Sequence, residues 1–283
     1  MTQPNANAPM QIDPLEIENP LDPRVADYVG IRERDLLGRG GRFIAEGAVV
    51  LRGLLASPWH QTESILIAAR HEARIRDMLF GAGKPHVPVM MASQAVLNAI
   101  AGFDLHRGIL ALGMRGPMPD LKAALAALPG RTRVLGLFGI SNHDNMGGLL
   151  RNAAAFGVDL VVLDSRCCDP FYRKALRVSV GAALGLPLAW ADSEAEALAA
   201  FEAHGLTAMA LSPSGRYVLS DYPVPDRVAA LFGAEGPGLA TETLRCADSV
   251  AIPMRGGFDS LNVATTSGIV LHHLAQHQDK KRG

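Results

Sequence analysis

The sequence predicts an α/β protein with two domains, the second of which is built around a parallel sheet. The first observation is that the 283-residue chain is 48% hydrophobic, which is enough material for two cores. The second is that short apolar strand patterns alternate with helix patterns on both sides of one break, Gly116–Pro117–Met118–Pro119–Asp120. Two prolines beside a glycine interrupt helix and strand alike, and such alternation is typical of α/β folds.

Composition and charge exclude several classes of protein. The formal net charge is −1, so a basic field over the whole surface is absent and any surface that binds nucleic acid must be local. We find no secretory signal and no uncharged apolar run long enough to span a bilayer. Three cysteines are too few for a disulfide framework, so we expect reduced thiols in a cytoplasmic protein.

The first predicted domain covers residues 24–115 and follows a tail, residues 1–23, that is rich in Pro, Asn and Gln and is expected to be disordered. Apolar spacing and capping residues define its elements. Ser93 is a helix cap, and Gly102 ends that helix. In chain order we expect a helix over 42–56, a strand over 64–69, a helix over 71–79, a strand over 87–91, the helix after Ser93, and a strand over 106–114.

A linker is predicted over 116–130, with room for a connecting helix over 120–128, and the second domain over 131–283. Its near-continuous apolar strands between helices favour a parallel sheet covered on both faces. Gly157 is a plausible helix C-cap, and Ser193 caps a helix. The expected strands are 133–140, 159–163, 207–211, 228–232 and 249–252, and the expected helices are 147–156, 172–184, 193–204 and 260–277.

A polar loop, Ser141–Asn142–His143–Asp144–Asn145, leads into the first helix of the second domain. Short polar residues before a helix are ordinary caps. Arg151 is less ordinary, because about one turn into the predicted helix a cation is mildly unfavourable against the helix dipole. A solvated surface arginine is the alternative to a functional one.

Basic residues gather at the start of the predicted helix 172–184. Arg173 and Arg177 are spaced to lie one turn apart on a single side. Together they make a compact positive charge that fits an RNA phosphate. A solvated basic face is the alternative.

A glycine-rich loop, Gly233–Ala234–Glu235–Gly236–Pro237–Gly238, follows an apolar strand. It is either a tight turn or a ligand loop that exposes backbone N–H and C=O groups. Glu235 would then stand at the carboxyl edge of the sheet, where open α/β folds bind ligands. The pattern does not match G-x-G-x-x-G, so a nicotinamide-binding site is weakly supported.

A third polar set follows near the carboxyl end: Ile252–Pro253–Met254, and then Ser260–Leu261–Asn262–Val263. Ser260 is a good N-cap for the last helix, whereas Asn262 in its first turn is less easily explained by structure. The intervening loop, 255–259, is expected to be flexible. His272, His273 and His277 lack accompanying carboxylates or cysteines, so we expect surface or dimer-face histidines and no metal site.

In order, spacing and residue identity, these motifs resemble the SpoU (TrmH-type) branch of the SPOUT RNA 2′-O-ribose methyltransferases. The likeness covers about half of the chain, and the stretch from Asn145 through Arg151 to Gly157 carries it almost letter for letter. It implies a parallel sheet with a trefoil knot and S-adenosylmethionine bound there by backbone groups of Gly233, Ile252 and Leu261. It also implies a homodimer in which Arg151 completes the neighbouring active site. The segments 43–47 and 107–111 resemble the substrate-binding domain of the family.

The resemblance implies five catalytic residues: Asn145, Arg151, Glu235, Ser260 and Asn262. An arginine keeps its proton in proteins, so we expect Arg151 to hold a phosphate and stabilise developing negative charge rather than act as a base. The other four would orient the ribose and the loop. His143–Asp144 departs from the Asp–Pro that the family often carries before the motif Asn. This departure either changes how the loop sits or tunes the choice of substrate, and we do not expect it to remove activity.

Three other functions stay open at this point. A non-catalytic RNA-binding protein that keeps the fold is the main alternative. A small-molecule enzyme with Glu235 as general base and a base-methylating SPOUT enzyme are the others. The sequence does not show whether the substrate is tRNA or rRNA, and it does not identify the modified nucleotide.

Overall fold

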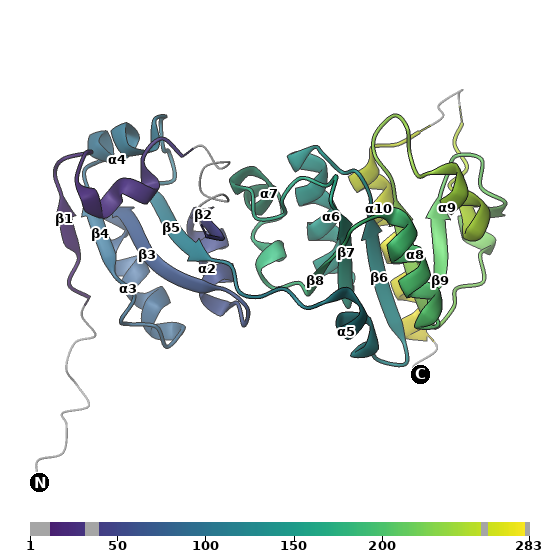
Figure 1. The fold of residues 1–283 in the computed structure, drawn as a ribbon. Coiled ribbons are helices and arrows are strands. Elements are labelled where there is room, and N and C mark those ends of the chain that lie inside the picture. Colours follow the sequence, from purple (N-terminus) through teal and green to yellow (C-terminus); the bar gives the residue numbers. More distant parts are fainter. Residues whose placement is uncertain (1–11, 32–39, 256–259, 281–283) are drawn as a thin grey trace, which may run out of the picture. The chain divides into compact units, whose positions relative to one another are not determined.

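The computed structural model describes residues 12–31, 40–255 and 260–280, and Figure 1 shows their path. The chain divides into two units between Gly116 and Pro117, inside the segment predicted as a linker. Most of that segment belongs to the second unit, because Leu121 and Leu125 are buried in its core. Asp120 caps the helix that carries them, accepting from the backbone N–H groups of Lys122 and Ala123.

A five-stranded mixed sheet forms the first unit, in the order β1-β4-β3-β5-β2. The pairs β1·β4 and β3·β4 are parallel, whereas β3·β5 and β2·β5 are antiparallel. Ser93 caps α4 as predicted, accepting from Val96 N–H. The elements in chain order are β1 (Leu15–Ile17), η1 (Pro23–Tyr28), β2 (Arg42–Glu46), α2 (Ala48–Ala56), β3 (Gln61–Ala68), η2 (Ala69–His71), α3 (Glu72–Gly81), β4 (Val89–Ala92), α4 (Gln94–Ala101) and β5 (Ile109–Met114).

Two predictions for the first unit were wrong. The single helix expected over 42–56 is a strand, β2, followed by the helix α2. Gly47, with φ of 87°, separates the two, and the run before it is buried against β5. A short apolar run fits a helix and a buried strand equally well by periodicity. The tail predicted as disordered contains β1, which pairs with β4; residues 1–11 lie outside the described part.

A seven-stranded sheet forms the second unit, and every strand pair in it is parallel, which confirms the predicted parallel sheet. The order is β10-β12-β9-β11-β6-β7-β8, with pairings recorded throughout as parallel. The strands are β6 (Thr132–Leu137), β7 (Leu160–Asp164), β8 (Leu188–Ala191), β9 (Thr207–Leu211), β10 (Tyr217–Val218), β11 (Arg227–Phe232) and β12 (Asp248–Ala251).

Helices cover both faces of this sheet. One core cluster joins α5, α8 and α9 to alternate strand residues such as Val134 and Leu231, and the strand residues between them face the other side. There α6, α7 and α10 pack together, and Figure 1 shows α8 and α10 on opposite faces. The helices are α5 (Leu121–Ala126), α6 (His143–Ala155), α7 (Arg173–Val178), η3 (Ala182–Leu184), α8 (Glu194–Ala203), η4 (Leu219–Asp221), α9 (Thr241–Cys246) and α10 (Val263–Lys280). Within the described ranges, none is both long and apolar enough to cross a bilayer.

Two helix boundaries in the second unit differ from the predicted ones near predicted site residues. The helix α6 begins at His143, four residues before the predicted start, because Asn142 caps it. Arg151 therefore lies two turns into the helix and not one. The predicted helix 172–184 is interrupted after α7, where Val180 and Gly181 have φ of 51° and 81°.

Candidate active site

Three polar side chains from distant parts of the chain form one hydrogen-bonded row. Asn145 Nδ2 donates to Glu235 Oε1 at 2.5 Å, and Asn262 Nδ2 donates to Asn145 Oδ1 at 2.8 Å. Asn145, the middle member, is only 6% exposed. The structure thus brings together one residue from each of the three predicted motifs, and we call these residues the Asn–Glu–Asn row.

Asn145 is held in the first turn of α6 by close helix packing around two glycines. A Cβ atom on Gly147 would lie 2.6 Å from Val178 Cβ in α7, and one on Gly148 would lie 2.6 Å from Ala264 Cβ in α10. Real side chains do not approach so closely, so only glycine lets both helices pack against α6 here. The glycine pair of the first motif is therefore needed for packing beside the site.

Asn262 has two roles at the start of α10. Its Oδ1 accepts from the backbone N–H groups of Ala264 and Thr265, at 2.9 and 3.2 Å, so Asn262 is the helix cap. Ser260, which was predicted as the cap, is exposed two residues earlier, and that prediction was wrong. The Nδ2 of Asn262 is left to bind Asn145, so helix capping and the site share one side chain.

The loop that carries Glu235 is folded tightly on itself. Gly238 N–H donates to Ala234 C=O at 2.9 Å, and a Cβ on Gly233 would lie 2.2 Å from the Gly238 carbonyl carbon. Gly236 and Gly238 have φ of 87° and 70°, which favours glycine at both positions. Glu235 lies between Gly233 and Gly236, and its hydrogen bond with Asn145 fixes the loop against α6.

The predicted cofactor residues follow neighbouring strands. Gly233 comes directly after β11 and Ile252 directly after β12, and only β9 lies between these strands in the sheet. Parallel strands end at one edge, so both residues lie at the carboxyl edge of the sheet. Leu261 is 43% exposed. It directly precedes Asn262, whose side chain is hydrogen-bonded to Asn145. The segment 256–259, most of the loop expected to be flexible, lies outside the described residues.

Arg151 is separate from the Asn–Glu–Asn row. Its side chain is exposed on α6, and within the described part of the chain no hydrogen bond or ion pair joins it to another residue. One subunit therefore does not bring Arg151 into the row, in contrast to Asn145, Glu235 and Asn262.

The basic residues of α7 lie as predicted. Arg173 and Arg177 are one turn apart in α7, and both are partly buried. Lys174 between them forms an exposed ion pair with Asp144 of α6, with 2.6 Å between Nζ and Oδ2.

Sequence reasoning missed Asp164, which ends β7. It is 1% exposed, accepts from Gly139 N–H at 2.8 Å and pairs with Arg166 at 2.8 Å. These contacts join the carboxyl ends of β6 and β7 beside the glycine-rich loop, because a Cβ on Gly139 would lie 3.2 Å from Ala234 Cβ. A carboxylate directly after a buried apolar strand was the available signal.

Two thiols near this edge are not nucleophiles. Burial raises the pKa of Cys167 to about 12 and the pKa of Cys168 to about 11. A thiol must ionise to attack, so both remain protonated at neutral pH. In the described ranges, no three His, Cys, Asp or Glu side chains are grouped so that they could hold a metal ion.

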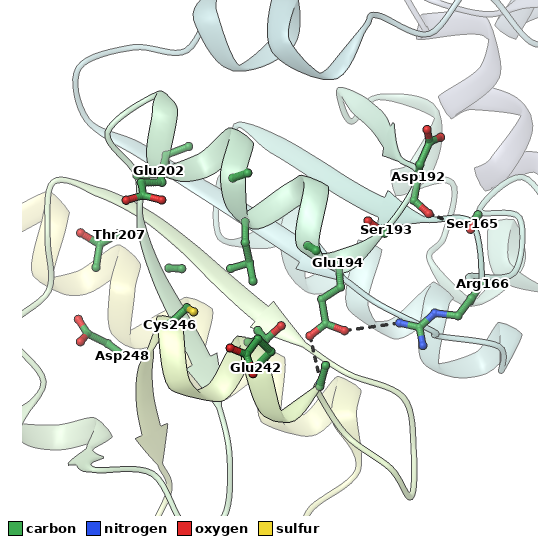
Figure 2. A pocket seen from close by; sticks show the side chains of 17 residues that line it. Ser165, Arg166, Asp192, Ser193, Glu194, Glu202, Thr207, Glu242, Cys246 and Asp248 are labelled. Atoms are coloured by element: carbon green, nitrogen blue, oxygen red, sulfur yellow. Dashed lines mark hydrogen bonds and ion pairs between the residues drawn. The ribbon is translucent and has the colours of Figure 1, made fainter.

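A groove of about 990 Å³ lies elsewhere, along α8 and α9, and Figure 2 shows its lining. None of the predicted site residues lines it. Its carboxylates outnumber its single cation, Arg166, which binds Glu194. Such a surface repels RNA phosphates, so the groove is a poor candidate for the substrate site. The carboxylates are Asp192, Glu194, Glu202, Glu242 and Asp248.

Comparison with known proteins gives concordant matches. A family model described as SpoU rRNA Methylase family matches residues 132–272. A tRNA/rRNA methyltransferase of Mycobacterium bovis, described as uncharacterized, is 36% identical over 94% of this chain and 93% of its own length. A solved RNA 2′-O ribose methyltransferase is 25% identical with a TM-score of 0.75, covering 94% of this chain and all of the other. An AdoMet-bound rRNA methyltransferase of Sinorhizobium meliloti is 22% identical with a TM-score of 0.77, covering 93% and 97%.

Proposed function

The chain belongs to the SpoU rRNA methylase family, and from this membership we propose that it transfers a methyl group from S-adenosylmethionine to a ribose 2′-hydroxyl of tRNA or rRNA. The observation that carries the proposal is the row Glu235–Asn145–Asn262, which joins all three predicted motifs by hydrogen bonds. Burying polar side chains costs free energy, so packing of a hydrophobic core does not explain this row. Fixing the shape of a ligand-binding loop does.

The carboxyl edge of the second sheet has the chemistry to hold S-adenosylmethionine. A Cβ on Gly236 or Gly238 would meet no heavy atom within 4 Å, so the outer side of the glycine-rich loop is open and its backbone groups are accessible. Ile252 and Leu261 add apolar contacts for an adenine ring, and Gly233 adds backbone. When bound, this cofactor supplies an electrophilic sulfonium methyl group. We also expect the trefoil knot of the family at this edge.

The Asn–Glu–Asn row would orient the substrate ribose. Glu235 uses Oε1 for Asn145, so Oε2 is left to accept the ribose hydroxyl, and Ser260 beside Asn262 would position the loop from the other side. An oxygen nucleophile has to be held at near-attack distance and in line with the methyl group. A prefolded row achieves this without ordering the loop during the reaction.

Arg151 would act in the active site of a partner subunit. Its guanidinium stays protonated and would hold the phosphate next to the target ribose while stabilising negative charge on the attacking oxygen. Its exposure on α6 supports a homodimer formed by α6 and α10, and Ile269 of α10 is 41% exposed.

The first unit would bind the substrate RNA. The two segments that resemble the substrate-binding domain lie together, because β2 pairs with β5 and Gly47 N–H donates to Ile109 C=O at 2.9 Å. Basic side chains gather at this end of the sheet: Arg107 packs on Gly47, and Arg70 packs on Gly108. Arginines at a sheet edge beside glycine backbone suit phosphate contacts, and Arg173 and Arg177 of the second unit would add further contacts.

Mapping 2′-O-methylation across total RNA from cells with and without the gene tests this function. A single mark that is lost in the deletion and restored by the wild-type gene, but not by an Arg151→Ala gene, is the expected result. An unchanged methylation map, together with calorimetry in which the purified protein does not bind S-adenosylmethionine, would instead point to a non-catalytic RNA-binding protein in a cytoplasmic complex.

A further inference from the structure

Two aromatic rings stack where α6 and α7 begin. His143, the first residue of α6, and Tyr172, which precedes α7, have ring centroids 4.0 Å apart and planes inclined by 30°. Both side chains are partly exposed, so this ring pair is not part of the hydrophobic core. Stacked and edge-to-face pairs are both ordinary arrangements of aromatic rings, so the feature that favours a ligand here is the partial exposure of both rings.

The ring pair lies next to the site along the chain. His143 is two residues before Asn145, whose side chain holds the catalytic loop. The ring pair is therefore close in sequence to the Asn–Glu–Asn row and lies where α6 and α7 begin.

The charges around the ring pair suit a nucleotide. Lys174 is paired with Asp144, and Arg173 and Arg177 continue along α7. Burial and the nearby Lys174 lower the pKa of His143, while Asp144 and Asp169 oppose the shift. The imidazole is therefore neutral at physiological pH and stacks as an uncharged aromatic ring. The positive charge near the ring pair comes from Lys174.

We propose that His143 and Tyr172 form a stacking surface for an unpaired nucleobase of the substrate RNA, with Lys174 binding the adjoining phosphate. Proteins recognise single-stranded RNA by stacking splayed bases on Tyr and His rings and by pairing basic side chains with the backbone. The exposed Lys174–Asp144 pair contributes little to stability, so Lys174 exchanges readily to a phosphate. This inference rests on the proposed function and adds to it a specificity determinant: the base next to the methylated ribose.

A purely structural role makes different predictions. If the ring pair only fastens α6 to α7, its removal lowers the thermal stability of the protein and shifts Asn145, and all RNA ligands are affected alike. If it is a stacking surface, its removal weakens binding only to RNA that carries bases.

The test compares two fluorescein-labelled probes of about twelve nucleotides: oligoadenylate, which is single-stranded, and an abasic ribose-phosphate chain of equal length. We expect the full-length wild-type protein to bind oligoadenylate more tightly. His143→Ala and Tyr172→Ala should weaken oligoadenylate binding roughly tenfold and leave the abasic chain unchanged. His143→Phe should retain the preference, whereas Lys174→Ala should weaken both probes alike.

Tyr217→Ala is the matched control, because Tyr217 is an exposed tyrosine that contacts another aromatic ring, Tyr222, and lies under Arg216 at 5.9 Å, remote in sequence from the motifs. It should leave the preference for oligoadenylate unchanged. Equal binding of oligoadenylate by wild type and His143→Ala, or parallel losses on both probes with a lowered Tm, would overturn the proposal. These outcomes are separate from a failure of the proposed function, in which the base preference persists but no RNA becomes methylated.

Discussion

The amide nitrogen of Asn145 lies 2.5 Å from Oε1 of Glu235, although ninety residues separate the two in the chain. The same Asn145 accepts the amide of Asn262. One buried side chain thus sets the relative position of the loop after β11 and the start of α10. Any change that reverses the polarity of Asn145 should act on both segments.

Asn145→Asp provides this change with almost no change in volume. It places a second carboxylate against Glu235, so repulsion replaces a charge-assisted hydrogen bond of about 1.5–3 kcal/mol. We expect methylation to fall roughly tenfold to a hundredfold and S-adenosylmethionine binding to weaken. Both are measurable by single-turnover assay and calorimetry.

Asn98→Asp is the matched control in the first unit. Asn98 Nδ2 also donates to a carboxylate, Oδ1 of Asp104, at 3.0 Å. The same chemical change there should lower thermal stability without affecting S-adenosylmethionine binding. If both variants weakened cofactor binding equally, the specific role of Asn145 in holding the loop after β11 would be refuted.

The row was partly predictable from the sequence, because Asn145, Glu235 and Asn262 each belong to one of the three polar motifs that resemble the family's motifs in order and spacing. The parallel sheet was predictable for a similar reason, since its strands are nearly continuous apolar runs. The sequence could not show which oxygen accepts from which amide. An asparagine can cap a helix or serve in a site, and residue type does not distinguish the two roles; Asn262 has both.

Local sequence patterns also gave wrong elements or boundaries where contacts between distant segments, or a capping side chain, determine the secondary structure. The run after Arg42 pairs with β5, a partner almost seventy residues away, and nothing nearby marks it as a strand. The early start of α6 depends on Asn142 and not on apolar spacing. Gly147 and Gly148 were expected to open the helix over 147–156, but no local pattern showed that they let α7 and α10 approach α6.

Gly148→Ala should therefore destabilise the second unit. Its Cβ would lie 2.6 Å from Ala264 Cβ, and the overpacking should cost about 1–3 kcal/mol. Calorimetry should show a lower Tm. Gly81→Ala is the control, because Gly81 also belongs to a helix and a Cβ there meets nothing within 4 Å; it should be neutral or slightly stabilising. An unchanged Tm for Gly148→Ala would show that α10 can move away freely.

Acid should weaken the first unit through His60. Burial, with a smaller contribution from Arg115, lowers the pKa of His60 from 6.5 to about 4, and its Nδ1 accepts from Gly116 N–H at 3.2 Å. The unfolded chain therefore takes up a proton between about pH 6.5 and 4 that the folded chain does not. Stability is fully present above this window and falls as the pH drops through it.

A pH series of thermal unfolding with His60→Gln tests this origin. The variant should be less stable at pH 7, because packing and the hydrogen bond are disturbed, yet its Tm should depend less steeply on pH between 6.5 and 4. His86→Gln, at an exposed histidine, should keep the wild-type slope. Equal slopes for wild type and His60→Gln would assign the acid sensitivity to other groups.

Arg151→Lys should slow methylation while leaving the fold intact. Lysine keeps the charge but lacks the planar fork that binds two phosphate oxygens at once. Because Arg151 is exposed, the Tm should not change, whereas the single-turnover rate with saturating RNA should fall about tenfold or more. A near-normal rate would show that the forked donor is not needed.

Heterodimers carrying two affinity tags can show which subunit Arg151 serves. If it acts in the partner's site, pairing an Arg151→Ala subunit with a Glu235→Gln subunit leaves one of two sites intact, and about half of the wild-type activity should return. Pairing a doubly substituted subunit with a wild-type subunit should leave no intact site. If Arg151 acts within its own subunit, the two results are exchanged, because the wild-type subunit then keeps a complete site. The comparison uses the same two substitutions in both dimers, so differences in stability between variants cannot produce the exchange.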